Sequence, residues 1–139
     1  MIFGTTLVVF VGFDVAWLAL VAVEMFQSQL GSILRPEPML GAAIAFYPIY
    51  SFGLVALAVH PAIAARSLWI AAAKGALVGL TAYATFDLTN LAIIKDWTVG
   101  LAIVDIAWGV VVSTVASIAG TFVGLRWGVA TTADGKTWG

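Results

Sequence analysis

The sequence predicts an all-α polytopic membrane protein, a four-transmembrane-helix bundle with both termini on the cytoplasmic side. Two observations predict this class. Of the 139 residues, 63% are hydrophobic and only 9% are charged, and the mean hydropathy of +1.09 lies far above that of soluble domains. The apolar residues also fall into four runs, each long enough to cross about 30 Å of hydrocarbon as a helix.

The four runs cover residues 2–26, 39–60, 68–94 and 98–126. The first is too long for a secretory signal and lacks its basic leader, so we expect it to remain as a membrane helix. Polar breaks follow at 27–38, at 60–67, where His60 and Pro61 indicate a helix end, and at 95–97. We therefore expect one integral membrane domain over residues 1–139, with a fraying polar tail at 127–139.

The orientation prediction depends on the basic residues, which are enriched in cytoplasmic loops. Four of them belong to the side that holds both termini and two to the other side: Arg66, Lys74, Arg126 and Lys136 against Arg35 and Lys95. Trp97 is expected in the aromatic belt at the membrane interface.

Small residues recur at four-residue spacing in the last two runs, where they would let helices approach closely in lipid. They are Ala71, Gly75 and Gly79, and Ala116, Gly120, Gly124 and Gly128. We expect both seams to pack within the bundle. The alternative is a homodimer or a partner in a larger membrane complex, docked through Gly75/Gly79 or Gly120/Gly124.

The composition excludes several functional classes. A net charge of -1 provides no basic surface for binding nucleic acid. Membrane lipids are the expected surroundings. With no cysteine and one histidine, His60, no metal site is predicted, and the residues indicate no particular cofactor. Signatures of Ser-His-Asp hydrolases, zinc proteases and nucleotide-binding loops are absent.

Three aspartates interrupt the apolar runs. Asp14 and Asp105 lie in the similar stretches "FDVAWL" (13–18) and "VDIAWG" (104–109), each three residues before a tryptophan, and Asp87 lies in the third run. Counted at about 1.5 Å per residue, all three are expected at one level, roughly 10–12 Å below the non-cytoplasmic face. Charged groups at such depth are costly and are usually kept for ions, protons or substrates.

No Lys or Arg is expected at that level, so at least one aspartate should be protonated at neutral pH and donate a hydrogen bond to another carboxylate, to Asn90 or to a tyrosine. The predicted ligand- or proton-binding residues are Asp14, Asp87, Asp105, Asn90, Tyr83, Tyr47, Trp17 and Trp108. The alternative is a polar network that only fixes helix packing, with the tryptophans as packing residues.

The order and spacing of "FYPIYSFGL", "GLTAYATFDLTNLA" and the two aspartate stretches resemble the domain-of-unknown-function family 2177, small predicted bacterial membrane proteins. The likeness covers nearly the whole chain, and "AYATFDLTN" followed by "DIAWG" is its most specific part. It implies a single-domain helical bundle in the bacterial inner membrane. It implies no activity.

Three hypotheses follow. The first is an acidic chamber that binds a small or amphiphilic ligand or cation, with proton exchange on an aspartate, as in a small proton-coupled carrier. The second is an accessory subunit of a larger membrane complex. The third is a membrane-embedded enzyme for lipid or isoprenoid substrates, in which the three aspartates act as acid-base groups or hold Mg²⁺.

Overall fold

The computed structural model describes residues 1–128, which form helices and, within that range, no strand. Four helical stretches are long and apolar enough to cross a membrane, and we refer to them as spans: Ile2–Leu30, Leu40–Ala64, Leu68–Ile93 and Val99–Trp127. The all-helical class and the four membrane-spanning helices predicted from the sequence are confirmed. Most of the predicted tail, residues 129–139 with Lys136, lies outside the described residues.

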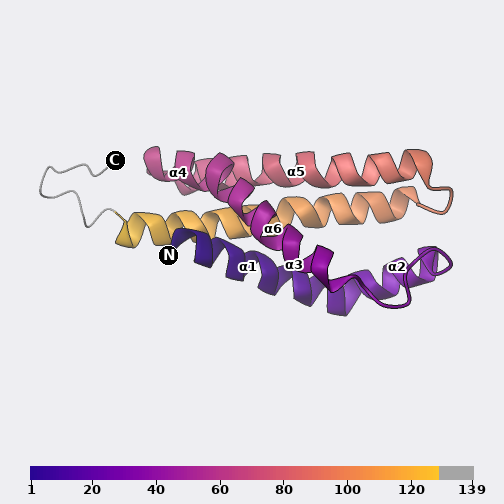
Figure 1. Ribbon diagram of the computed structural model, residues 1–139. Helices are drawn as coiled ribbons and strands as arrows, with labels where there is room; N and C mark the ends of the chain where they lie inside the picture. Colours follow the sequence, from indigo (N-terminus) through magenta and orange to yellow (C-terminus); the bar gives the residue numbers. More distant parts are fainter. Residues whose placement is uncertain (129–139) are drawn as a thin grey trace, which may run out of the picture.

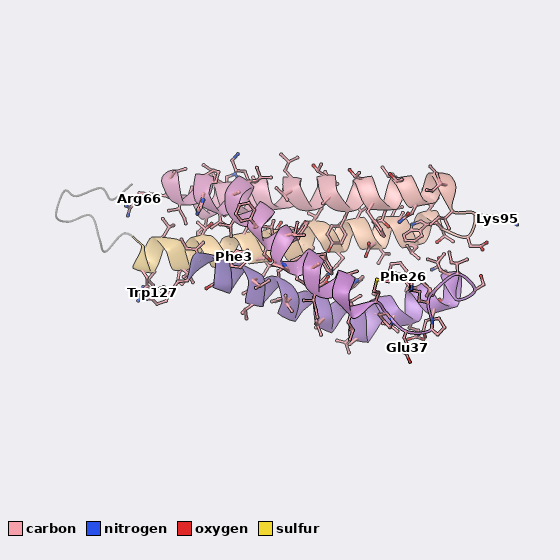
Figure 2. All side chains as sticks on the ribbon, in the orientation of Figure 1. Phe3, Phe26, Glu37, Arg66, Lys95 and Trp127 are labelled. Carbon is pink, nitrogen blue, oxygen red and sulfur yellow. The ribbon has the colours of Figure 1, made fainter. Side chains whose placement is uncertain are left out.

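The bundle has two ends (Figure 1). The terminal end holds Met1, the 65–67 connection and the last turn of the fourth span, whereas the loop end holds the connections at 31–39 and 94–98. Charged side chains occupy both ends, with Arg66 at the terminal end and Glu37 and Lys95 at the loop end (Figure 2). Charges placed in this way stay in water when the apolar middle of the bundle lies in a bilayer.

The first span is longer than the sequence indicated. It joins α1 (Ile2–Trp17), the π-helical turn η1 (Leu18–Ala22) and α2 (Val23–Leu30) without a break. The predicted end at residue 26 was too early, because Leu30 is buried in a core cluster with Trp97 and Leu101. Packing of this kind holds a polar last turn in helical form.

The second span also continues past its predicted end. It consists of α3 (Leu40–Leu54), the π-helical η2 (Val55–Val59) and α4 (His60–Ala64). The prediction that His60 and Pro61 end the helix was wrong. Proline has no N–H and its ring collides with the carbonyl four residues back. The wider π turn directly before Pro61 accommodates that ring, so the helix runs on.

The last two spans, α5 (Leu68–Ile93) and α6 (Val99–Trp127), form a tight hairpin. The hydroxyls of Ser67 and Thr98 cap their first turns by accepting from backbone N–H groups. The backbones come closest at Gly79, where an added Cβ would lie within 2.8 Å of the Gly109 carbonyl group. Side chains larger than hydrogen would separate the helices here.

The glycines of both seams pack within the chain, as expected. A Cβ on Gly75 would lie 2.7 Å from the Ser117 Oγ atom, and Gly120 and Gly124 face side chains of the first two spans. The homodimer or complex partner through these glycines stays a prediction.

The arrangement of the spans leaves space in the loop half of the bundle. α6 is the most buried helix and lies against the other three spans. The second span crosses the bundle obliquely (Figure 1), so that α3 packs on α1 while η2 and α4 pack on α5. α3 and α5 therefore hardly touch each other.

Candidate functional site

A cavity of about 540 Å³ lies in this space, and we call it the pocket. Its size is within the range of about 300–1,000 Å³ that is typical of small-molecule sites. The core cluster of Phe10 and Val112 lies on its terminal side, and that of Leu30 and Trp97 on its loop side. All four spans line the pocket, largely with aromatic rings: Phe10, Trp17, Phe26, Phe46, Tyr50, Tyr83 and Phe86.

The pocket opens between α3 and α5. Phe46 on α3 and Phe86 on α5 both line it, yet they are 41% and 54% exposed. Because the two helices diverge here, these rings flank the opening. In a bilayer, such a gap between helices faces the acyl chains.

Asp14 is held firmly at the edge of the pocket. Its Oδ2 atom accepts a hydrogen bond from the Tyr47 hydroxyl at 2.9 Å, and its Oδ1 atom accepts one from the Trp108 Nε1 atom at 3.2 Å. Each oxygen thus has a donor from a different span. Asp14 ties α1 to α3 and α6. It accepts from Tyr47, whereas the prediction had a protonated aspartate donating to a tyrosine.

The tryptophans of the two similar stretches meet. Trp17 and Trp108 stack with ring centroids 4.7 Å apart and planes 7° from parallel. Trp17 also lines the pocket, whereas the Trp108 N–H group donates its hydrogen bond to Asp14. The spacing of three residues between aspartate and tryptophan places each pair on one helix face, and the antiparallel run of α1 and α6 brings the two faces together.

Asp105 and Asp87 form a second acidic group. Asp105 is 8% exposed and lines the pocket, while Asp87 lies behind it with 0% exposure. The Asp105 carboxyl and the Trp97 indole are the polar groups beside Asp87, but its oxygens reach hydrogen-bonding geometry with neither. Trp97 is therefore buried next to a carboxyl group at the loop end of the bundle, and its predicted place in the interfacial belt stays a prediction.

The three aspartates do not share one level, in contrast to the prediction. Gly120 and Gly124 of α6 face Thr6 and Ile2 of α1, and this register sets Asp14 opposite Val112. Asp105 lies about 10 Å from Val112 along α6, near the loop end together with Asp87. The prediction misplaced Asp14 because it counted depth from the start of the first span and assumed a crossing of about 30 Å, whereas that span runs through 29 residues.

Two tyrosines complete the wall. The Tyr83 ring rests on the backbone of Gly109, where an added Cβ would come within 2.6 Å of three ring atoms. Tyr50 meets Tyr83 edge to face at 6.2 Å between centroids, and its hydroxyl is hydrogen-bonded to the Ser113 Oγ atom at 2.8 Å. The stretch "DIAWG" thus has three roles. Asp105 lines the pocket, Trp108 donates to Asp14, and Gly109 packs against the Tyr83 ring.

Not every predicted residue lines the pocket. Asn90 lies one turn beyond Asp87 toward the loop end, is absent from the lining, and its side chain makes no hydrogen bond within residues 1–128. Tyr47 is also outside the lining and contributes through the hydrogen bond that its hydroxyl donates to Asp14. The sequence prediction missed Phe10 and Tyr50, although each lies on the same helix face as a predicted residue: Phe10 is four residues before Asp14, and Tyr50 is three after Tyr47.

The acidic residues do not converge on a single point. In the described part of the chain, no group of three or more His, Cys, Asp or Glu side chains is arranged to hold a metal ion. The structure therefore offers no three-carboxylate ligand set for Mg²⁺. Two carboxyl groups line the pocket: Asp14, whose oxygens both accept hydrogen bonds, and Asp105, with Asp87 behind it. The chemistry available is that of these carboxyl groups and of the faces of aromatic rings.

Four apolar helices around a pocket with buried carboxyl groups define a polytopic helical membrane protein. The family described as "Predicted membrane protein (DUF2177)" matches residues 1–122, and the chain belongs to this family, as the resemblance of its motifs indicated. No curated protein and no solved structure matches the chain.

Proposed function

We propose that this protein binds a lipophilic organic cation in the pocket and exchanges it against a proton held by Asp87 and Asp105, as a small carrier of the bacterial inner membrane would. The observation that carries the proposal is the accessible Asp105 carboxyl within an aromatic wall that contains no Lys or Arg. A cation is the natural counterpart of an unpaired carboxylate in a low-dielectric site.

The wall favours an organic cation over a hydrated metal ion. A cation over an aromatic face gains about 0.5–2 kcal/mol, and Phe46, Tyr83 and Phe86 line the same pocket as Asp105. Metal ions such as Ca²⁺ or Mg²⁺ require six or so oxygen ligands. A ligand with apolar substituents would also reach the pocket from the acyl chains through the gap between α3 and α5.

The second carboxyl supplies the exchangeable proton. Two adjacent carboxyl groups shielded from water do not both ionise readily and titrate as a pair. Asp87 and Asp105 therefore hold one proton as a pair when the pocket is empty, although their oxygens are not hydrogen-bonded to each other. A bound cation stabilises the Asp105 carboxylate, so that the proton leaves as the cation binds, and protonation in turn releases the cation.

Tetraphenylphosphonium binding, measured by titration calorimetry on the detergent-purified protein, tests this proposal. Wild type should bind the cation, and Asp105→Asn should bind it at least about tenfold more weakly, since a loss of about 1.4 kcal/mol is tenfold. Asp96→Asn is the matched control, because it removes an exposed carboxylate in the 94–98 connection. Its affinity should equal that of wild type.

Aromatic variants extend the test to the wall. Phe46→Ala should weaken binding, whereas Phe52→Ala, on the same helix but outside the pocket lining, should not. Circular dichroism and gel filtration show that each variant is folded. The proposal is wrong if wild type does not bind the cation, or if folded Asp105→Asn binds it as well as Asp96→Asn does.

A further inference from the structure

A second concave surface lies on the outer side of α5. It has a volume of about 580 Å³ and is lined by Leu57 of η2 and by one face of α5 from Lys74 to Thr85. We call it the α5 groove. Lys74, Leu77, Thr81 and Thr85 are exposed, so the groove faces the surroundings of the bundle rather than its interior.

Apart from Lys74, the groove presents a hydrocarbon surface. The hydroxyls of Thr81 and Thr85 donate to the backbone carbonyls of Leu77 and Thr81, at 2.8 and 2.6 Å. Their protons are therefore satisfied within the helix, and their methyl groups remain for contact. The other lining residues are Leu, Val and Ala.

Among residues 1–128, no carboxylate forms an ion pair with Lys74. No acidic residue lines the groove, and Asp14, Asp87 and Asp105 are buried on the inner faces of their helices. Lys74 lies about 9 Å along α5 from Leu68, inside an apolar span where an isolated charge is costly. An anion from outside the chain would remove that cost.

The dimensions of the groove fit a phospholipid. From Lys74 to Thr85 the helix rises about 16 Å, and one leaflet contributes about half of a 30 Å hydrocarbon core. Among the α5 residues of the groove, Lys74 is the nearest to the terminal end, where Arg66 also lies (Figure 2). A lysine stem bends toward the membrane surface so that its ammonium group reaches the headgroups.

We propose that the α5 groove binds an anionic phospholipid, with the lipid phosphate on the Lys74 ammonium group and an acyl chain along the helix toward Thr85. A partner helix would need a carboxylate at this one depth and a small face to enter the groove. A lipid brings both a phosphate at the membrane surface and a chain that adapts to the aliphatic wall. The groove shares Ala82 with the pocket and is otherwise lined by different residues.

Native mass spectrometry of the purified protein tests this site with two lipids of identical chains, phosphatidylglycerol and phosphatidylcholine. Wild type should retain phosphatidylglycerol preferentially. Lys74→Gln should lose about fivefold of that preference, the value of one lysine near an anionic headgroup. Lys95→Gln removes an equal charge at the loop end and should keep the preference.

A second pair of variants tests the wall of the groove without changing its charge. Leu77→Trp fills the groove and should reduce retention of both lipids, whereas Leu80→Trp, on the same exposed helix but outside the lining, should not. The inference is overturned if Lys74→Gln keeps the full preference, or if Leu80→Trp acts as Leu77→Trp does. A dimer that forms without any preference for phosphatidylglycerol overturns it in favour of a second copy.

Discussion

Gly109→Ala is the substitution whose effect follows most directly from the geometry. The new methyl group would lie within 2.6 Å of three atoms of the Tyr83 ring, whereas ordinary contact begins at 3.4 Å. Tyr83 is confined between Gly109 and Tyr50, so its ring has to move by roughly 1 Å or the helices have to part. Overpacking of this kind costs about 1–3 kcal/mol.

Two other helical glycines provide matched controls. An added Cβ at Gly12 or Gly53 meets nothing within 4 Å, so alanine there should be neutral or should stabilise the helix by up to about 1 kcal/mol. The free energy of unfolding, measured by circular dichroism during titration of mixed micelles with a denaturing detergent, should therefore separate Gly109→Ala from both controls by about 1 kcal/mol or more.

The double variant Gly109→Ala/Tyr83→Ala identifies the cause. If the alanine methyl group acts by colliding with the ring, the two substitutions together should cost less than the sum of the two alone. Additive costs, or a Gly109→Ala variant as stable as Gly12→Ala, would refute the tight seat of Tyr83 on α6.

Three further predictions concern single contacts. Tyr47→Phe removes a donor to Asp14 and should cost about 1–2 kcal/mol of unfolding free energy, whereas Tyr83→Phe, whose hydroxyl makes no hydrogen bond within residues 1–128, should cost little. Ser67→Ala removes the N-cap of α5 and should cost about 1 kcal/mol, in contrast to Ser28→Ala on an exposed turn. If the Asp87–Asp105 pair holds a proton in the folded state, as proposed, stability of the wild type should fall as pH rises, and Asp87→Asn should flatten this dependence.

Each of these predictions has a clear contrary result. Equal costs for Tyr47→Phe and Tyr83→Phe would show that the hydroxyl of Tyr47 does not stabilise the fold. A Ser67→Ala variant as stable as Ser28→Ala would show that the Ser67 hydroxyl does not stabilise α5 as an N-cap. The sign of the pH effect is set by the proton: a pair that is protonated in the fold stabilises it at low pH and ceases to do so as pH rises. Stability that rises with pH would contradict a shared proton.

The spans could be predicted from hydropathy, but their ends could not. Polar residues after position 26 indicate a loop when the chain is read alone, and only burial of Leu30 against Trp97 keeps them helical. Pro61 likewise indicates a helix end when the chain is read alone. The π turn directly before it allows the helix to continue. In both cases a contact or a turn outside the local pattern decides the boundary.

The sequence predicts which residues belong to the candidate site better than it predicts their positions relative to one another. Charged groups are rare in apolar helices, so Asp14, Asp87 and Asp105 were identifiable at once. Their grouping depends on the register between helices, which the contact of Gly120 with Thr6 fixes and which no local pattern records. The burial of Trp97 beside Asp87 depends on the same register.

The number of protons released per cation bound is the most direct test of exchange at the pocket. It is obtained by titrating tetraphenylphosphonium into the wild-type protein in buffers of different ionisation enthalpy at neutral pH. Binding linked to the shared proton should release up to about one proton per cation, and Asp87→Asn should release markedly less. Tight binding with no proton release in the wild type would contradict exchange and leave a simple cation-binding pocket.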